Sequence, residues 1–242
     1  MYIESLSNKK IKDLNKLKNK KYRDLENLFL VEGWHLVKEA YNAGILKEVL
    51  VLKDTFVEMN CNIIYTTEEV LKYLSDVDTP QNIIGVCKKI DNNKIGKKVV
   101  ILDDIQDPGN LGTIIRSSVA FNFDTIILSN NSVDIYNPKV IRATQGMLFK
   151  VNIIRCDLTE EISKLKDDGY RILATKVTNG KDVKTLEKIE KLCIIMGNEG
   201  NGVSDKVLAL ADDFIYIKMN KNCESLNVGV ATSILLYELG SD

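Results

Sequence analysis

The 242-residue sequence has few of the residues from which metal sites and catalytic triads are built. It contains one histidine, His35, and five widely spaced cysteines with no Cys-x-x-Cys pair. Structural zinc sites and disulfide frameworks need closer or paired ligands, so the sequence predicts neither a metal site nor a disulfide. We predict that the cysteines are buried, reduced thiols. For His35, a structural role is favoured over a contact to RNA.

Long apolar runs, a large net charge and proline-rich tracts are also absent. No apolar run approaches the roughly 18 residues that span a bilayer, and the polar N-terminus lacks the apolar core of a signal peptide. The chain is therefore predicted to be cytoplasmic, with no membrane contact. The net charge is −1, so a surface for nucleic acid would require local clustering of basic residues.

Helical and strand-like patterns alternate along the chain, which predicts an α/β fold with a mostly parallel sheet. A polar stretch at 90–98 is the predicted boundary between a domain at 1–90 and a domain at 97–242. Strands are predicted at 27–31, 48–52, 82–87, 99–103, 124–129, 151–154, 170–175, 192–196 and 214–217. Helices are predicted at 8–25, 34–43, 67–75, 111–121, 137–142, 159–168, 204–210 and 224–239.

The first predicted helix is strongly basic. Between Lys9 and Arg23 there are eight basic residues against one acid, Asp13. Such a run is typical of a solvated helix face, and it is equally typical of a surface that neutralises RNA phosphates. The candidate RNA-binding residues are Lys9, Lys10, Lys12, Lys20, Lys21, Arg23 and, further along the chain, Arg142.

Three polar segments follow apolar runs that read as buried strands. They are residues 107–116 (DPGNLGTIIR), 196–202 (MGNEGNG) and 224–228 (ESLNV). In an open α/β sheet the carboxyl ends of strands are where ligands bind. We predict that Asn110 caps the helix that starts near Leu111, and that Ser225 and Asn227 lie in the first turn of the last helix.

The glycines of the second segment do not fit the common nucleotide-binding motifs. No Gly-Lys-Ser/Thr follows them, and their spacing differs from the Rossmann G-x-G-x-x-G. ATP and NAD are therefore poorly supported as ligands. Ser225 also lacks a histidine partner within sequence reach, which argues against a covalent nucleophile.

Together the three segments resemble the signature motifs of the SpoU family, within the SPOUT superfamily of RNA methyltransferases. The connecting stretch 132–142 (SVDIYNPKVIR) resembles the family too, and residues 1–90, with FLVEG at 29–33, resemble its small α/β domain that binds RNA. The sequence departs from the family at Asp104 and Lys221, where glycine is usual, and at Lys218, where proline is usual.

The resemblance implies a parallel α/β sheet whose C-terminal part forms a deep trefoil knot, and a homodimer. It implies transfer of a methyl group from S-adenosylmethionine to a ribose 2′-hydroxyl of RNA. The residues implied to bind the cofactor are Met196, Gly197, Gly202, Ile217, Met219, Leu226 and Asn227. The implied catalytic residues are Asn110, Arg116, Glu199, Ser225 and Asn227.

The N-terminal domain favours large-subunit (23S) rRNA as the substrate, because tRNA-modifying members tend to lack that domain. Two alternatives remain open: a tRNA 2′-O-methyltransferase, and a non-catalytic RNA-binding protein that retains the fold. The residues do not distinguish housekeeping modification from protection against an antibiotic.

Overall fold

A computed structural model describes residues 1–91, 94–177 and 180–240. The chain forms two compact units. The first unit comprises Met1–Asp91 together with Asp134–Lys150, and the second comprises Asn92–Val133 and Val151–Asp242. The predicted boundary at 90–98 includes Asn92 and Asn93, which lie outside the described residues. Residues 134–150 lie within the second predicted domain but pack with the first unit.

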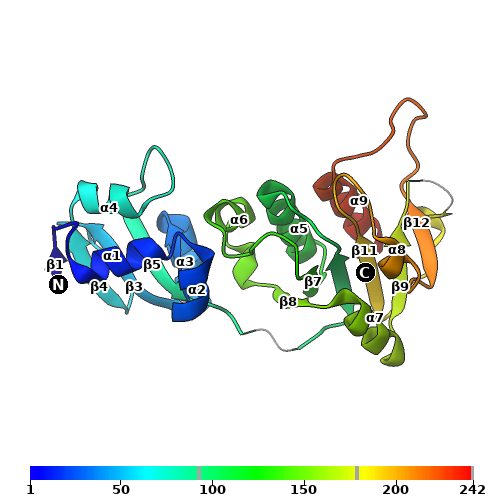
Figure 1. The fold of residues 1–242 in the computed structure, drawn as a ribbon, viewed down its shortest axis with the longest axis horizontal. Helices are drawn as coiled ribbons and strands as arrows, with labels where there is room; N and C mark the ends of the chain where they lie inside the picture. The colour runs from blue at the N-terminus through cyan, green and yellow to red at the C-terminus, as the bar shows by residue number, and fades with distance from the viewer. Residues whose placement is uncertain (92–93, 178–179, 241–242) are drawn as a thin grey trace. The chain divides into compact units, whose positions relative to one another are not determined.

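The first unit is built on a mixed five-stranded sheet in the order β1-β4-β3-β5-β2 (Figure 1). Its strands are β1 (Tyr2–Ile3), β2 (Leu28–Glu32), β3 (Leu46–Leu52), β4 (Asn62–Thr66) and β5 (Ile83–Lys88). Its helices are α1 (Lys9–Lys16), α2 (Lys20–Glu26), α3 (Trp34–Asn42), α4 (Glu68–Leu74) and α6 (Pro138–Thr144), followed by the 3-10 turn η1 (Met147–Phe149).

The basic N-terminal helix is two helices rather than the single predicted one. Asn19 accepts a hydrogen bond from the backbone N–H of Lys21, at 2.9 Å, and so caps α2 directly after α1 has ended. Ile11, Leu14 and Leu17 lie in the core between these helices and the sheet. The strands β1 and β4 were not predicted. β1 has only two residues, which is too short for an alternating pattern to show.

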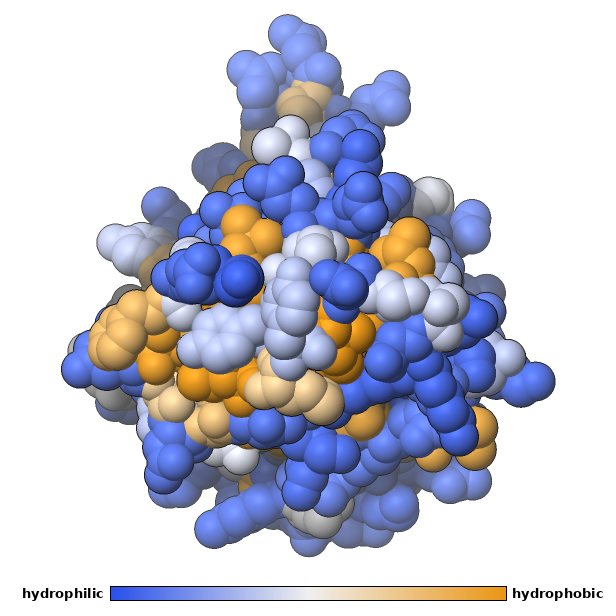
Figure 2. All heavy atoms as spheres, turned by 90° about the vertical axis from the view of Figure 1, so that its left-hand side faces the viewer, coloured by the Kyte–Doolittle hydropathy of each residue, from blue (hydrophilic) through white to orange (hydrophobic). Residues whose placement is uncertain are grey.

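One face of the first unit exposes apolar side chains. α3 packs on β2, β3 and β5, so the two remaining strands of that sheet, β1 and β4, extend beyond it. Tyr2 on β1 pairs with Tyr65 on β4, and Tyr2 is 49% exposed. Figure 2 shows apolar atoms gathered in the middle of the face at this end of the molecule, within a mostly hydrophilic surface.

Residues 134–150 are attached to the first unit by aromatic packing. The rings of Phe29 and Tyr136 have centroids 4.6 Å apart, and the Tyr136 hydroxyl accepts a hydrogen bond from the backbone N–H of Ile90 at 2.8 Å. Burial raises the pKa of Tyr136 to about 12, so this phenol stays protonated at neutral pH. His35 belongs to the same region, with its Nε2 3.1 Å from the Gln145 carbonyl oxygen.

The second unit is built on a seven-stranded sheet in the order β10-β12-β9-β11-β6-β7-β8, and every described strand pair in it is parallel. Its strands are β6 (Lys98–Leu102), β7 (Thr125–Ser129), β8 (Asn152–Cys156), β9 (Arg171–Thr175), β10 (Lys181–Asp182), β11 (Leu192–Met196) and β12 (Asp213–Tyr216). Its helices are α5 (Pro108–Ala120), α7 (Leu158–Asp167), α8 (Asp205–Leu208) and α9 (Val228–Gly240), with the 3-10 turn η2 (Val183–Thr185). The prediction of a mostly parallel α/β sheet is confirmed.

Helices cover both faces of this sheet. Apolar residues of α7 and α8 form a buried cluster with alternate residues of β6, β9 and β11. α5 and α9 pack side by side (Figure 1). Among the described residues, no helix is long and apolar enough to cross a membrane. The knot is not tested by these contacts and stays a prediction.

Strand order brings two of the three polar segments together. β6 and β11 are neighbours, with Leu102 opposite Met196 at their carboxyl ends. The first segment follows β6 and the second follows β11, so both loops leave the same edge of the sheet. On one side of β6 lie the strands that follow it directly in the chain, β7 and β8. On its other side lie later strands, β11 and then β9, so the order of the strands reverses at β6. Such a switch point is where open α/β sheets place their ligands.

The five cysteines are all free thiols. Cys87 and Cys193 are buried, and burial raises the pKa of the Cys156 thiol to about 11. The prediction of burial is wrong for Cys223, which is exposed in the loop that precedes α9.

Candidate active site

The first segment begins α5 earlier than predicted, and its cap is Asp107 rather than Asn110. The Asp107 carboxylate accepts a hydrogen bond from the Asn110 backbone N–H at 2.7 Å, and Pro108 occupies the first turn. Asp followed by Pro is a recognisable helix start. The N–H of the first helical residue has no partner within the helix, so proline, which lacks an N–H, loses nothing there. Asn110 is therefore inside the helix, and its side chain is available for other contacts.

Asn110 joins all three polar segments. Its Nδ2 donates to Glu199 Oε1 of the second segment at 3.0 Å. Its Oδ1 accepts from Asn227 Nδ2 of the third segment at 2.8 Å. We call this Glu199–Asn110–Asn227 chain of hydrogen bonds the amide relay. The predicted residues Asn110, Glu199 and Asn227 are thus brought together from positions up to 117 residues apart.

Glu199 is held as a carboxylate. Partial burial raises the pKa of Glu199, but the hydrogen bonds from Asn110 and from backbone N–H groups outweigh burial and hold it below its usual value. The backbone donors include those of Asp107, at 3.2 Å, and Gln106, at 3.4 Å. A carboxylate with a lowered pKa is a weak base, so Glu199 is suited to fixing the first segment rather than to accepting a proton.

The second segment folds into a tight hairpin. Asn198 and Gly202 exchange two backbone hydrogen bonds of 2.9 and 3.0 Å, and Gly202 adopts a positive φ of 69°. The Asn198 side chain closes the turn by accepting from the Gly200 N–H at 2.9 Å and donating to the Asp104 carbonyl at 2.7 Å. Asn198 was not singled out from the sequence, although an asparagine two residues before a glycine is a known turn signal.

The third segment is irregular up to Asn227, and α9 begins at Val228 rather than at Glu224. The Asn227 Oδ1 accepts from the backbone N–H groups of Gly229, at 2.9 Å, and Val230, at 3.2 Å. Asn227 therefore caps α9 while its Nδ2 bonds to Asn110. The prediction that Ser225 lies in the first turn is wrong, because Ser225 precedes the helix.

A cleft of about 650 Å³ opens beside the amide relay. This size suits a small-molecule ligand. Its walls come from the second segment, from the stretch between β12 and α9, and from the end of β9. The lining includes all seven residues predicted to bind the cofactor: Met196, Gly197, Gly202, Ile217, Met219, Leu226 and Asn227. Lining residues that the sequence did not indicate are Thr175, Lys176, Val177, Leu208, Tyr216, Ala231 and Leu235.

The cleft has the features that a bent nucleoside cofactor requires. Its lining includes apolar residues such as Leu208, Leu226 and Leu235, and the three glycines of its second-segment wall carry no side chain that could fill it. Gly197 permits this wall, since a Cβ there would stand 2.0 Å from the Gly202 carbonyl carbon. The residues present therefore fit S-adenosylmethionine. Among the described residues, no group of three or more His, Cys, Asp or Glu side chains could hold a metal.

Arg116 lies two turns along α5 from Asn110 and is exposed. It does not line the cleft, and within the described part of the chain its side chain has no hydrogen-bond or ion-pair partner. A guanidinium in this position is free to meet an anionic ligand arriving from outside the second unit.

The predicted RNA-binding residues fall into different environments. Lys9, Lys12 and Lys21 are exposed. Lys10 is paired with Glu48 at 2.6 Å, and Lys20 with Asp24 at 2.5 Å. The Lys20–Asp24 pair is exposed, so it contributes little to stability and its lysine can exchange partners. The Glu48 partner of Lys10 is buried.

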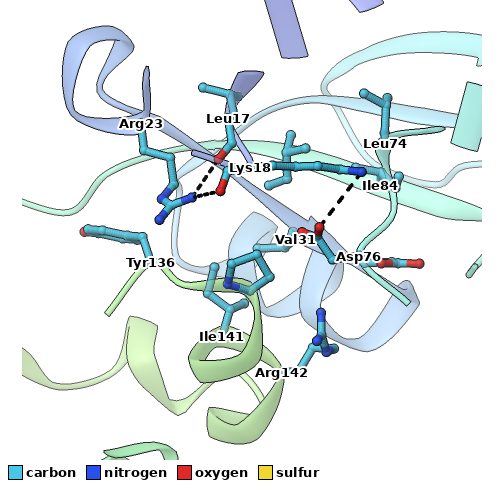
Figure 3. A pocket seen from close by; sticks show the side chains of 13 residues that line it. Leu17, Lys18, Arg23, Val31, Leu74, Asp76, Ile84, Tyr136, Ile141 and Arg142 are labelled. Atoms are coloured by element: carbon cyan, nitrogen blue, oxygen red, sulfur yellow. Dashed lines mark hydrogen bonds and ion pairs between the residues drawn. The ribbon is translucent and has the colours of Figure 1, made fainter. Parts of the chain in front are cut away.

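Arg23 is not available for RNA. Its side chain is 5% exposed and donates to the carbonyl oxygens of Leu17 and Lys18, at 2.8 and 2.7 Å, and to Asp134 Oδ2 at 2.7 Å. Figure 3 shows the guanidinium turned toward these carbonyls. Arg142, from α6, lines the same small pocket of the first unit. The role of Arg23 is therefore to hold the α1–α2 turn to residue 134.

We predict that Arg23→Ala lowers the free energy of unfolding by about 3 kcal/mol, because it leaves Asp134 and two carbonyls without their buried donor. Urea unfolding of the full chain measures this change. Lys21→Ala, on the exposed side of the same helix, is the matched control and should change stability by less than about 0.5 kcal/mol. Unchanged stability of the Arg23 variant with weaker RNA binding would restore Arg23 to the RNA-binding surface.

Comparison with known proteins decides the family. Residues 97–237 match the model of the SpoU rRNA Methylase family, and residues 8–85 match that of the MRM3-like substrate binding domain. The chain belongs to the SpoU rRNA methylase family. This confirms the family prediction made from the three motifs.

Several relatives of this SpoU family member are similar over almost their whole length. The 23S rRNA (guanosine(2553)-2′-O)-methyltransferase RlmP of Bacillus subtilis is 37% identical over 243 residues, covering 98% of each chain. The structure of an rRNA methyltransferase from Sinorhizobium meliloti superimposes with a TM-score of 0.87 at 29% identity, covering 99% of this chain and 96% of that one. An AdoMet-bound rRNA methyltransferase structure from the same organism has a TM-score of 0.87 at 28% identity, covering 99% and 97%.

Proposed function

We propose that the chain transfers a methyl group from S-adenosylmethionine to a ribose 2′-hydroxyl of large-subunit rRNA. The observation that carries the proposal is the amide relay beside the cleft, which joins the three SpoU motifs through side chains that can orient a sugar hydroxyl. The B. subtilis relative, similar over 98% of both chains, is named for this reaction on 23S rRNA.

The amide relay and Arg116 have different roles in the proposed reaction. When bound, S-adenosylmethionine supplies an electrophilic methyl group. The chain's residues then have to hold the 2′-hydroxyl in line with that methyl and assist loss of the hydroxyl proton. Asn110, Asn227 and Ser225 orient the ribose. The Arg116 guanidinium binds the neighbouring phosphate and stabilises negative charge that develops on the 2′-oxygen.

The first unit is proposed to bind the RNA substrate, with Lys9, Lys12 and Lys21 as free phosphate contacts. Lys20 is proposed as an exchangeable contact, and Lys10 as a contact shared with the buried Glu48. Its match to a substrate-binding domain supports this role. Arg142 is retained as a contact on the same unit. We propose a homodimer in which Arg116 acts at a site completed by the partner subunit, and we expect the enzyme to act in the cytoplasm.

The experiment that tests this function is methyl transfer from labelled S-adenosylmethionine to total RNA, separated by size. We expect label in large-subunit rRNA, in a ribose 2′-O-methyl group, with mapping started at the guanosine for which the B. subtilis relative is named. Label in tRNA would support the tRNA alternative. Cofactor binding without methylation of any RNA, including assembling ribosomal particles, would support the non-catalytic alternative.

A further inference from the structure

The guanidinium of Arg155 donates hydrogen bonds to four backbone carbonyls at the end of β7 and in the loop that follows it. Arg155 lies on β8, and the loop is the one that leaves the neighbouring strand β7. The Arg155 Nη1 donates to the carbonyl oxygens of Ser129, Asn130 and Ser132, at 2.9, 3.1 and 2.8 Å, and its Nη2 donates to that of Val133 at 2.7 Å. Because Nη1 carries two N–H groups, at least one of them is shared between two of its three carbonyls. The planar fork directs Nη2 to the fourth carbonyl, whereas a lysine has all its donors on a single nitrogen.

The same loop holds residues 104–106, which lead into the first SpoU segment. Five hydrogen bonds join them. Ser129 Oγ donates to Asp104 Oδ1 at 2.5 Å and accepts from the Asp104 N–H at 2.9 Å, and Asn131 Nδ2 donates to Asp104 Oδ2 at 3.4 Å. Gln106 Nε2 donates to the Asn131 carbonyl at 2.9 Å, and the Val133 N–H donates to the Ile105 carbonyl at 2.9 Å. Asp104 is in the left-handed region, with φ of 60°, so the turn depends on outside contacts to keep its shape.

From there the contacts continue to the amide relay. The backbone N–H groups of Gln106 and Asp107 donate to the Glu199 carboxylate, and Glu199 holds Asn110. None of the loop residues 129–133 and none of residues 104–107 lines the cofactor cleft. Asp104 also accepts a hydrogen bond from the Asn198 side chain of the hairpin that forms one cleft wall. A displacement of the loop would therefore reach the relay through Glu199 and the hairpin through Asn198.

We propose that Arg155 is a positioning residue for methyl transfer, which sets the first segment, and through it Asn110, by fixing the loop 130–133. The expected loss of turnover rests on the proposed function. The expected loosening of residues 104–107 rests on the hydrogen bonds alone. Arg155 touches neither the reacting atoms nor the cleft. Its effect passes through Asp104 and Gln106, and it requires the fork of the guanidinium rather than a positive charge.

Two variants test the proposal, Arg155→Ala and Arg155→Lys, with Arg171→Ala as the matched control. Arg171 is an exposed arginine on β9 of the same sheet, where it forms an ion pair with Asp213. Both Arg155 variants should lower kcat about tenfold, since small misplacements of reacting groups have effects of this order or larger. KM for RNA should stay within twofold of wild type, Kd for S-adenosylmethionine should rise by a smaller factor than kcat falls, and the control should resemble wild type.

The second measurement is amide hydrogen exchange, which needs no turnover. Exchange should rise at residues 104–107 and 130–133 in the two Arg155 variants and stay unchanged in the control. Unchanged exchange at 104–107 would overturn the proposal, as would a lysine variant with wild-type kcat, or an unchanged kcat with a raised, salt-dependent KM that indicates direct RNA contact. If wild type methylates no RNA, the proposed function fails, while the exchange result still decides the role of Arg155.

Discussion

Arg116→Ala is expected to lower the rate of methyl transfer at least 100-fold and to leave S-adenosylmethionine binding within twofold of wild type. Removing a single group that stabilises charge in a transition state has effects of about 100- to 1,000-fold. Binding should persist because Arg116 lies outside the residues that line the cleft. Stability should change by less than about 0.5 kcal/mol, since the side chain is exposed and has no partner within the described residues.

The test pairs single-turnover methyl transfer with calorimetric titration of the cofactor. Arg116→Lys separates charge from geometry: a lysine keeps the charge but not the planar donors, so we expect only partial recovery. Arg171→Ala controls for the loss of one positive charge from the second unit. Equal losses of turnover and cofactor affinity in Arg116→Ala would show that this arginine supports the cleft rather than the transition state.

The motifs predicted which residues lie together where the contact depends on strand order. A polar segment after each buried strand predicts side chains at one edge of a parallel sheet, and the amide relay joins residues from all three segments. The sequence could not show which atoms form the hydrogen bonds. Asn110, for example, was predicted to cap α5. Asp107 takes that place and leaves the Asn110 side chain to bridge Glu199 and Asn227.

Irregular loops were the least predictable part. The start of α9 was placed four residues too early, because the residue that caps the helix is Asn227 and the segment before it is irregular. The departure at Asp104 became clear only from its backbone. Its positive φ explains why glycine is usual there in the family, and the hydrogen bond from Ser129 Oγ helps to hold an aspartate in this conformation.

The grouping of residues 134–150 with the first unit could not have been read from local patterns. It rests on contacts between residues far apart in the chain, such as the tilted ring contact of Tyr136 with Phe29 and the ion pair of Asp134 with Arg23. The same contacts explain why Arg23 was assigned to RNA. In the sequence it is one more member of a basic run, and only the fold shows that it is buried.

Gly197→Ala is expected to weaken S-adenosylmethionine binding at least tenfold and to lower the free energy of unfolding by about 1–3 kcal/mol, the range for forced overpacking. A Cβ at this position would stand 2.0 Å from the Gly202 carbonyl carbon and 2.1 Å from the Val203 nitrogen. Both are backbone atoms of the same hairpin, so no side chain can turn aside. The hairpin must open, and it forms one wall of the cleft.

Gly200→Ala is the matched control within the same hairpin. A Cβ there would meet only the Asn198 Oδ1, at 3.5 Å, which is an ordinary contact. Cofactor titration and thermal unfolding of both variants measure the difference, and the Gly200 variant should resemble wild type in both. If Gly197→Ala bound the cofactor normally, the prediction would be wrong, because the hairpin could then widen without any loss of cofactor affinity. If both variants lost binding equally, any change in this hairpin would be harmful, and the close approach at Gly197 would not be the cause.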